Sequence, residues 1–96
     1  MYLTVDDKKV YAYSANRAFD PARPTLVFIH GAANDHSVWV LQSRYFAYHG
    51  WNALAPDLPG HGKSGGKALA DIGSLADWVA RLLDAAGAGN AVLAGH

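Results

Sequence analysis

The sequence contains no cysteine and no glutamate. Without cysteine, the chain cannot hold a disulfide framework, a thiolate metal site or a cysteine nucleophile. All eight acidic residues are therefore aspartates, and eight lysines and arginines balance them to a formal net charge of zero. A neutral chain without a basic stripe gives no electrostatic reason to bind nucleic acid or an anionic membrane, so neither is expected as a partner.

Long apolar runs are also missing. No run approaches the roughly 18 residues that a membrane-spanning helix needs, and residues 1–7 lack the basic and then apolar layout of a signal peptide. We therefore expect a cytoplasmic protein. The 96 residues, 51% of them hydrophobic, allow one small globular domain with a marginal core, because a chain of this length buries only about 60–65% of its unfolded surface.

The hydrophobic pattern predicts five strands. Two short runs rich in aromatic and β-branched residues flank a polar turn and predict a β-hairpin. The later apolar runs are typical of strands buried in a parallel sheet, and a proline ends the second of them. The expected strands are Tyr2–Val5, Val10–Ser14, Thr25–Ile29, Trp51–Asp57 and Ala91–Ala94.

A first helix is predicted between the two middle strands. Asp35 or Ser37 can serve as its N-cap, and Gly50 is well placed as its C-terminal stop. Apolar residues follow helical spacing from Val38 onward. The side chains expected to face the core are Val38, Leu41, Tyr45 and Phe46.

The second helix has the clearest pattern in the sequence. Ser74 and Asp77 resemble a capping box at its start, and Gly87 and Gly89 follow its last turn. The apolar stripe consists of Leu75, Trp78, Val79, Leu82, Leu83 and Ala86. A hairpin followed by strand–helix–strand–helix–strand predicts an α/β fold with a mainly parallel sheet. In such sheets, ligands bind beyond the carboxyl ends of the strands.

Three motifs fall at those carboxyl ends. His30-Gly31 follows the first buried strand, the segment Asp57–Ser64 (DLPGHGKS) follows the second, and Gly95-His96 ends the third. Gly95 and His96 fit the first two places of the Gly-x-Ser-x-Gly nucleophile elbow. In this order, the motifs resemble the N-terminal part of the α/β-hydrolase family, in its esterase and lactonase branch. The resemblance covers essentially all 96 residues as part of a single domain.

The resemblance gives a role to the loop after the first buried strand. In the family, the residue after His-Gly donates a backbone N–H to the oxyanion of the transition state, so Ala32 is the candidate donor. Each such donor contributes roughly 3–4 kcal/mol by deletion. Gly31 lets the backbone approach the oxygen, and His30 is expected to support the loop by hydrogen bonds. Taken alone, the segment also fits an ordinary strand-to-helix turn that uses Gly31 for its backbone angle.

The resemblance also places the nucleophile directly after His96, with Gly95 and His96 as its elbow neighbours. Ala33 and Trp39, close to the oxyanion loop, are candidate substrate contacts. No serine within the chain sits at a strand-to-helix elbow, so no complete catalytic triad is present, and in the family the acid and histidine come later. No cofactor is implied.

Two other interpretations of these motifs fit the residues less well. Gly62-Lys63-Ser64 matches the end of a Walker A motif, but Asp57 stands where its first glycine belongs, and Gly65-Gly66 follows where a helix must begin. The histidines lack metal-binding spacing, so no metal site is expected. Asp57 is expected to bond nearby backbone N–H groups, and His36 and His49 to be surface or cap residues.

The function implied by the resemblance is hydrolysis of a carboxylic ester or lactone through a serine acyl-enzyme. An aspartate at the elbow would instead imply an epoxide hydrolase or dehalogenase, and loss of triad residues would imply a non-catalytic ligand-binding member.

A single-domain hydrolase would run to roughly 250 residues, so the remainder of the hydrolase chain is expected as the partner of this part. We expect the sequence to stop at His96 because the next residue is non-standard, such as a serine carrying a covalent adduct. A truncated or cleaved chain is the alternative.

Overall fold

The computed structural model describes residues 1–31, 34–66, 68–69 and 71–95. Five strands form one sheet in the order β1-β2-β4-β3-β5. A 3-10 turn, η1, leads into helix α1, and helix α2 precedes the last strand. The elements are β1 (Tyr2–Val5), β2 (Lys8–Tyr13), β3 (Thr25–Ile29), η1 (His36–Trp39), α1 (Val40–Tyr48), β4 (Asn52–Pro56), α2 (Ile72–Ala86) and β5 (Ala91–Gly95). The predicted α/β arrangement of hairpin, strand, helix, strand, helix and strand is confirmed.

The sheet is antiparallel in its hairpin half and parallel in the other. β1 pairs with β2 and β2 with β4 in antiparallel register, whereas β3 runs parallel to both β4 and β5. Asp6 and Asp7 in the hairpin turn both have positive φ, at 53° and 60°, as a type I′ turn requires. Parallel pairing brings the carboxyl ends of β3, β4 and β5 to one edge, where Ile29 is in register with Gly95.

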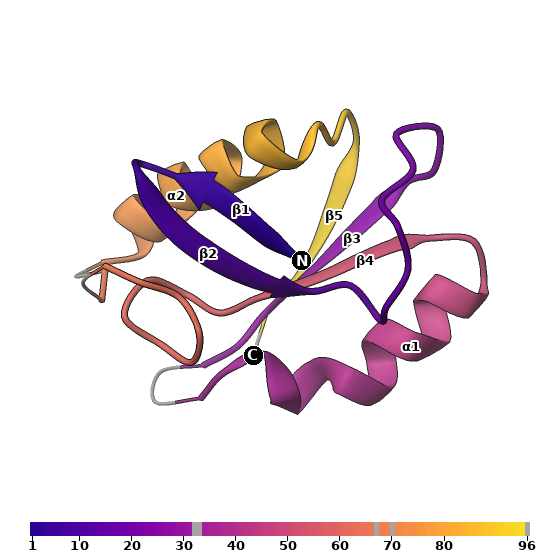
Figure 1. Ribbon diagram of the computed structural model, residues 1–96, viewed down its shortest axis with the longest axis horizontal. Helices are drawn as coiled ribbons and strands as arrows, with labels where there is room; N and C mark the ends of the chain where they lie inside the picture. The colour runs from indigo at the N-terminus through magenta and orange to yellow at the C-terminus, as the bar shows by residue number, and fades with distance from the viewer. Residues whose placement is uncertain (32–33, 67, 70, 96) are drawn as a thin grey trace.

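The two helices cover opposite faces of this sheet (Figure 1). On the α2 face, buried residues of the helix pack against the hairpin, and on the α1 face the core lies between α1 and the strands β3 and β4. The α2 face buries Val5, Val10, Trp78, Val79 and Leu82. The α1 face buries Leu26, Phe28, Ala47, Ala53 and Ala55. Neither helix is long and apolar enough, in the part of the chain that the structure describes, to cross a bilayer.

Helix α2 begins earlier than predicted. Its N-cap is Asp71, whose carboxylate accepts a hydrogen bond from the main-chain N–H of Ser74 at 2.7 Å. The predicted capping box at Ser74 and Asp77 is therefore wrong, because an equally good N-cap residue stands three positions upstream. The C-terminal prediction is confirmed, since Gly87 ends the helix in the left-handed conformation with φ of 76°.

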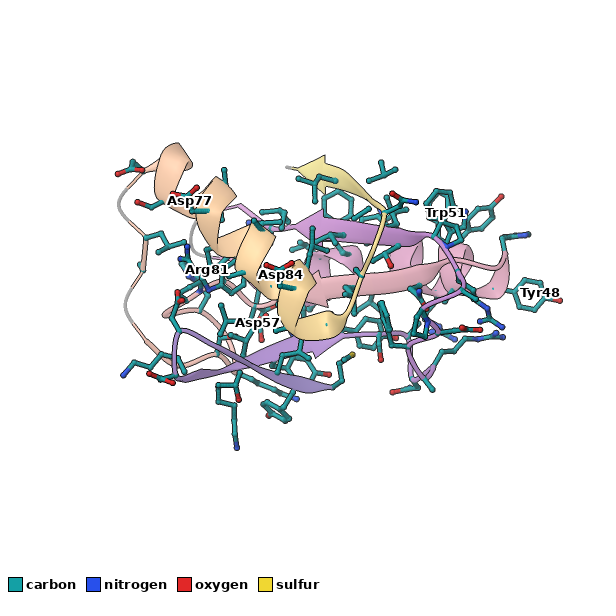
Figure 2. All side chains as sticks on the ribbon, turned by 90° about the horizontal axis from the view of Figure 1, so that it is seen from above. Tyr48, Trp51, Asp57, Asp77, Arg81 and Asp84 are labelled. Carbon is teal, nitrogen blue, oxygen red and sulfur yellow. The ribbon has the colours of Figure 1, made fainter. Side chains whose placement is uncertain are left out.

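Helix α1 buries a different face from the predicted one. Val38, Leu41 and Tyr45 are 44%, 76% and 59% exposed, so the prediction that they face the core is wrong. Ser43 and Ala47 face the sheet instead, because small side chains let the helix approach the strands closely. Figure 2 shows Tyr48, at the end of α1, pointing away from the body of the molecule. Phe46 is half-buried as expected, and Gly50 follows the C-cap residue His49.

Strand β5 is more exposed than its apolar sequence predicts. Val92 and Leu93 are 53% and 56% exposed, which contradicts the expectation of a buried strand from Ala91 to Ala94. The physical reason is its position, since β5 pairs with β3 on one side and meets no strand on its other side among the described residues. An apolar strand at a sheet edge stays open on the side that lacks a neighbour.

Candidate functional site

The candidate site lies at the edge where the three parallel strands end. His30 follows β3, Asp57 follows β4, and Gly95 is the last residue of β5. Figure 2 labels Trp51 and Asp57, which flank β4 and show the direction in which these strands run. The fold thus brings His30, Gly31 and Gly95 to one edge. Three further predicted site residues, Ala32, Ala33 and His96, lie outside the described residues.

His30 is buried, at 3% exposure, and both of its ring nitrogens are used. The main-chain N–H of Leu58 donates to Nε2 at 3.0 Å, so the ring hydrogen belongs on Nδ1. There it donates to the carbonyl oxygen of Gly31 at 2.7 Å. This tautomer, assigned from its hydrogen bonds, ties the start of the loop after β3 to the loop after β4.

Asp57 is fully buried, at 0% exposure, and its carboxylate accepts three hydrogen bonds. The main-chain N–H and the Nδ1–H of His36 both donate to Oδ1, at 2.7 and 2.9 Å. The main-chain N–H of Lys63 donates to Oδ2 at 2.8 Å. Charge-assisted bonds of this kind replace the water that a buried carboxylate loses. The prediction that Asp57 bonds nearby backbone N–H groups is confirmed.

His36 is the residue that sequence reasoning missed. Its side chain is 16% exposed, and the prediction that it is a surface or cap residue is wrong. The imidazole lies edge-on to the ring of Tyr11, with centroids 4.9 Å apart, and stacks on Tyr13 at 5.9 Å. One feature of the sequence indicated that such a residue exists. A carboxylate directly after a buried strand, such as that of Asp57, needs several hydrogen-bond donors. His49, in contrast, is an exposed C-cap residue as predicted.

The glycine-rich loop, residues 58–66, folds around Asp57. The hydroxyl of Ser64 donates to the carbonyl oxygen of Asp57 at 2.6 Å and accepts the main-chain N–H of Tyr11 at 3.0 Å. Gly62 has a positive φ of 49°, and a Cβ there would lie 2.5 Å from Cγ of Asp57. Because Ser64 is bonded within the protein and α2 starts only at Ile72, the loop does not have the phosphate-binding geometry of a Walker A motif.

A cleft of about 410 Å³ opens between the loop after β3 and the glycine-rich loop. His61, on one wall, has its ring centroid 5.1 Å from that of His30, and its Nδ1 lies 3.0 Å from the carbonyl oxygen of Pro59. Asp35, on the other wall, accepts the Ser37 hydroxyl at 2.6 Å, which is the main cause of the lowered pKa of its carboxyl group. The cleft lining is mostly polar and comprises Asn34, Asp35, Ser37, Val38, Gly60, His61 and Gly62.

Trp39 packs under the site. Its ring centroid lies 5.0 Å from that of Phe28, and its half-buried side chain joins the core on the α1 face. Contact between Trp39 and a substrate stays a prediction, as does contact with Ala33.

One group of side chains in the described part of the chain has the composition of a metal site. Asp35, His36 and Asp57 each offer one ligand atom, and these atoms lie within 4.8 Å of one another. However, both oxygens of Asp57 already accept N–H groups, and Nδ1 of His36 is itself one of the donors. A metal ion would have to displace these bonds, so the arrangement does not fit one.

Comparisons with known proteins agree on the fold. A family model described as alpha/beta hydrolase fold matches residues 24–96. The 2-succinyl-6-hydroxy-2,4-cyclohexadiene-1-carboxylate synthase of Salmonella paratyphi B is 45% identical over 65 residues, which are 68% of this chain and 23% of that protein. A bacterial membrane phospholipase A superposes with a TM-score of 0.86 at 30% identity, and epoxide hydrolase A from Mycobacterium thermoresistibile with 0.83 at 25%. Each superposition covers 100% of this chain and 30% of the other, so the chain spans less than a third of each of these proteins.

Proposed function

Because the chain belongs to the α/β-hydrolase family, we propose that the protein carrying it hydrolyses carboxylic ester or lactone bonds through a serine nucleophile. The observation that supports this most directly is the juxtaposition of two strand ends. Ile29, which leads into His30-Gly31, is in register with Gly95. An elbow mechanism needs the oxyanion donors beside the nucleophile, and the adjacent ends of β3 and β5 support this proposal.

In the proposed reaction, the serine hydroxyl directly after His96 attacks the carbonyl carbon of the substrate. The resulting oxyanion accepts hydrogen bonds from the main-chain N–H of Ala32 and from that of the residue after the nucleophile. Collapse of the tetrahedral intermediate breaks the bond to the alcohol oxygen, which takes the proton back from the base, and leaves an acyl-enzyme that water then hydrolyses. Gly31, without a side chain, lets the backbone approach the oxyanion at the start of the donor loop, and Gly95 and His96 shape the elbow.

The proton of the nucleophile must go to a histidine elsewhere. His30 has both ring nitrogens bonded to main-chain groups. His36 packs beside Tyr11 and Tyr13 of β2, and two strands separate β2 from β5 in the sheet. In this family the acid and the histidine follow the nucleophile along the chain, so we assign the base and its acid partner to the remainder of the hydrolase chain.

Strand β5 is the surface on which we place that remainder. Val92 and Leu93 project to opposite faces of the sheet, because successive side chains alternate along a strand, and both are more than half exposed. A further strand on the open edge, with a helix over each face, would bury both residues. Strands covered in this way are typical of parallel α/β sheets.

The test uses the product of the native gene. We expect it to turn over an activated ester such as p-nitrophenyl acetate, and a fluorophosphonate probe to modify it once. Peptide mapping by mass spectrometry should place the adduct on a serine adjacent to His96. Denatured protein, in which the oxyanion loop is unfolded, is the control for labelling.

An epoxide hydrolase with an aspartate nucleophile is the second candidate, and the structural similarity to an epoxide hydrolase favours it. In that case the fluorophosphonate leaves the protein unlabelled, and styrene oxide is hydrolysed. A single turnover in water enriched in the heavy oxygen isotope would then give a diol carrying enzyme-derived light oxygen. If neither substrate is turned over and no serine is labelled, the proposed hydrolase function is refuted in favour of a ligand-binding role.

A further inference from the structure

Two histidines bracket the loop that carries the candidate oxyanion donor. His30 precedes this loop and His36 follows it, and each is bonded to the loop after β4, at the consecutive residues Leu58 and Asp57. We propose that His36 is a positioning residue: through Asp57 it fixes the far end of the oxyanion loop, as His30 fixes the near end. The catalytic part of this inference rests on the proposed hydrolase function.

The bond between His36 and Asp57 is a two-point attachment. Both the main-chain N–H and Nδ1–H of His36 donate to the same oxygen, Oδ1. The first bond fixes the backbone where the loop enters η1, and the second fixes the imidazole. Because Asp57 is fully buried and its Oδ2 is bonded to the main-chain N–H of Lys63, the carboxylate is itself held in place.

The ring of His36 is held by packing as well. Tyr11 meets it edge-on and Tyr13 stacks on it, at centroid distances of 4.9 and 5.9 Å. Both tyrosines belong to β2, which pairs with the end of β4 through Ala12 and Pro56. The position therefore accommodates a flat aromatic ring, while the bond to Asp57 depends on a donor next to Cγ.

His30 and His36 are bonded to consecutive residues, and this matters for the position of the oxyanion donor between them. Leu58 and Asp57 are joined by one peptide unit, and the carboxylate of Asp57 is held by its burial and by its bond to Lys63, so the two anchor points lie close together and are both restrained. His30 and His36 are thereby both held at the loop after β4, and the main-chain N–H of Asn34 donates to the carbonyl oxygen of Gly31 at 3.2 Å. Oxyanion stabilisation depends on donors that are fixed before the reaction begins.

Two substitutions separate the donor of His36 from its packing. His36→Asn keeps a donor, because Nδ2 of asparagine, like Nδ1 of histidine, is bonded to Cγ, but it loses the ring. His36→Phe keeps the ring between the tyrosines and loses the donor. His49→Asn and His49→Phe repeat both changes at an exposed histidine and serve as matched controls.

The first measurement is amide hydrogen exchange of the peptide spanning residues 31–38 in the native gene product. We expect faster exchange in His36→Phe, and near wild-type exchange in His36→Asn and in both His49 variants. Melting temperatures identify any variant that fails to fold. Wild-type exchange in a folded His36→Phe, or equally fast exchange in His36→Asn, would overturn the positioning role.

The second measurement is the kinetics of ester hydrolysis. His36→Phe should lower kcat by roughly 10- to 100-fold, the size of effect that a small misplacement of a catalytic group produces, and leave KM nearly unchanged because ground-state binding is untouched. His36→Asn should recover most of kcat. Equal kcat in wild type and His36→Phe would overturn the catalytic part. If the wild type itself has no esterase activity, the proposed function and this catalytic part fail together, and hydrogen exchange alone decides whether His36 holds the loop.

Discussion

Replacing Gly62 with alanine tests whether the buried carboxylate of Asp57 determines the shape of the glycine-rich loop. Gly62 has a positive φ of 49°. An added Cβ would lie 2.5 Å from Cγ and 2.7 Å from Oδ1 of Asp57, far inside van der Waals contact. The carboxylate has no free space to move into, because it is fully buried and bonded to His36 and Lys63.

The expected cost of Gly62→Ala has two parts. A non-glycine residue in the left-handed region is disfavoured by about 1–2 kcal/mol. Moving the carboxylate away from the new methyl group breaks at least one hydrogen bond to a buried charge, which costs about 1.5–3 kcal/mol. Together these predict a loss of about 2.5–5 kcal/mol, a large share of the roughly 5–15 kcal/mol by which a typical domain is stable.

Urea unfolding, followed by the fluorescence of the three tryptophans, measures this loss, and two other glycines provide controls. Gly87 has a φ of 76° with nothing within 4 Å of an added Cβ, so Gly87→Ala should cost only the backbone strain. Gly89 has neither a left-handed φ nor a close contact, so Gly89→Ala should leave stability unchanged. In a double-mutant cycle, Asp57→Ala should remove the excess cost of Gly62→Ala. Equal costs for Gly62→Ala and Gly87→Ala would refute the clash with Asp57.

Three further predictions follow from the helices and from Asp35. Ser43→Ala should leave the free energy of unfolding unchanged or raise it by about 0.5–1 kcal/mol, because the fully buried hydroxyl has no hydrogen-bond partner among the described residues; a clear loss in thermal unfolding would contradict this. Asp71→Ala should lower the melting temperature more than Ser74→Ala, since Asp71 supplies the cap and accepts the main-chain N–H of Ser74, which alanine retains. The pKa of Asp35 is lowered in the folded state from 3.8, chiefly by the Ser37 hydroxyl, so its stabilising contribution is complete above that value and is lost as the pH falls through the lower folded pKa. Asp35→Asn should therefore flatten the acid limb of the urea midpoint plotted against pH, and an unchanged limb would contradict the assignment.

The two helices show what hydrophobic periodicity can and cannot predict. The stripe of α2 places Trp78, Val79 and Leu82 in the core, because this helix packs large side chains against the hairpin. In α1 the same reasoning selected Leu41 and Tyr45, which are exposed. Close packing of a helix against a sheet favours small side chains on the buried face. A hydrophobicity pattern does not distinguish such a face from one that is exposed to solvent.

The part of the candidate site that lies directly at the ends of the strands could be predicted from the sequence. His30-Gly31 and Gly95 follow from the positions of strand ends, which a parallel sheet brings to one edge. His36 could not be found in this way. Its partner is 21 residues away in the sequence, and its ring contacts come from the hairpin, so it carries no local pattern. The exposure of β5 depends on what covers its edge, and the strand's own residues do not encode that.

Asp57 links three parts of the chain that are distant in sequence. Its main-chain N–H donates to the carbonyl oxygen of Tyr11, at 2.8 Å, its carbonyl oxygen accepts Ser64, and its carboxylate accepts His36 and Lys63. The hairpin, the glycine-rich loop and the end of the proposed oxyanion loop therefore meet at one residue. A substitution in β2 that shifts Tyr11 should consequently disturb the proposed oxyanion loop, although two strands separate β2 from β5 in the sheet. The size of this effect should depend on the hydrogen bonds to Asp57 and not on the distance from the proposed nucleophile, because Asp57 is fully buried and a lost bond to a buried group is costly.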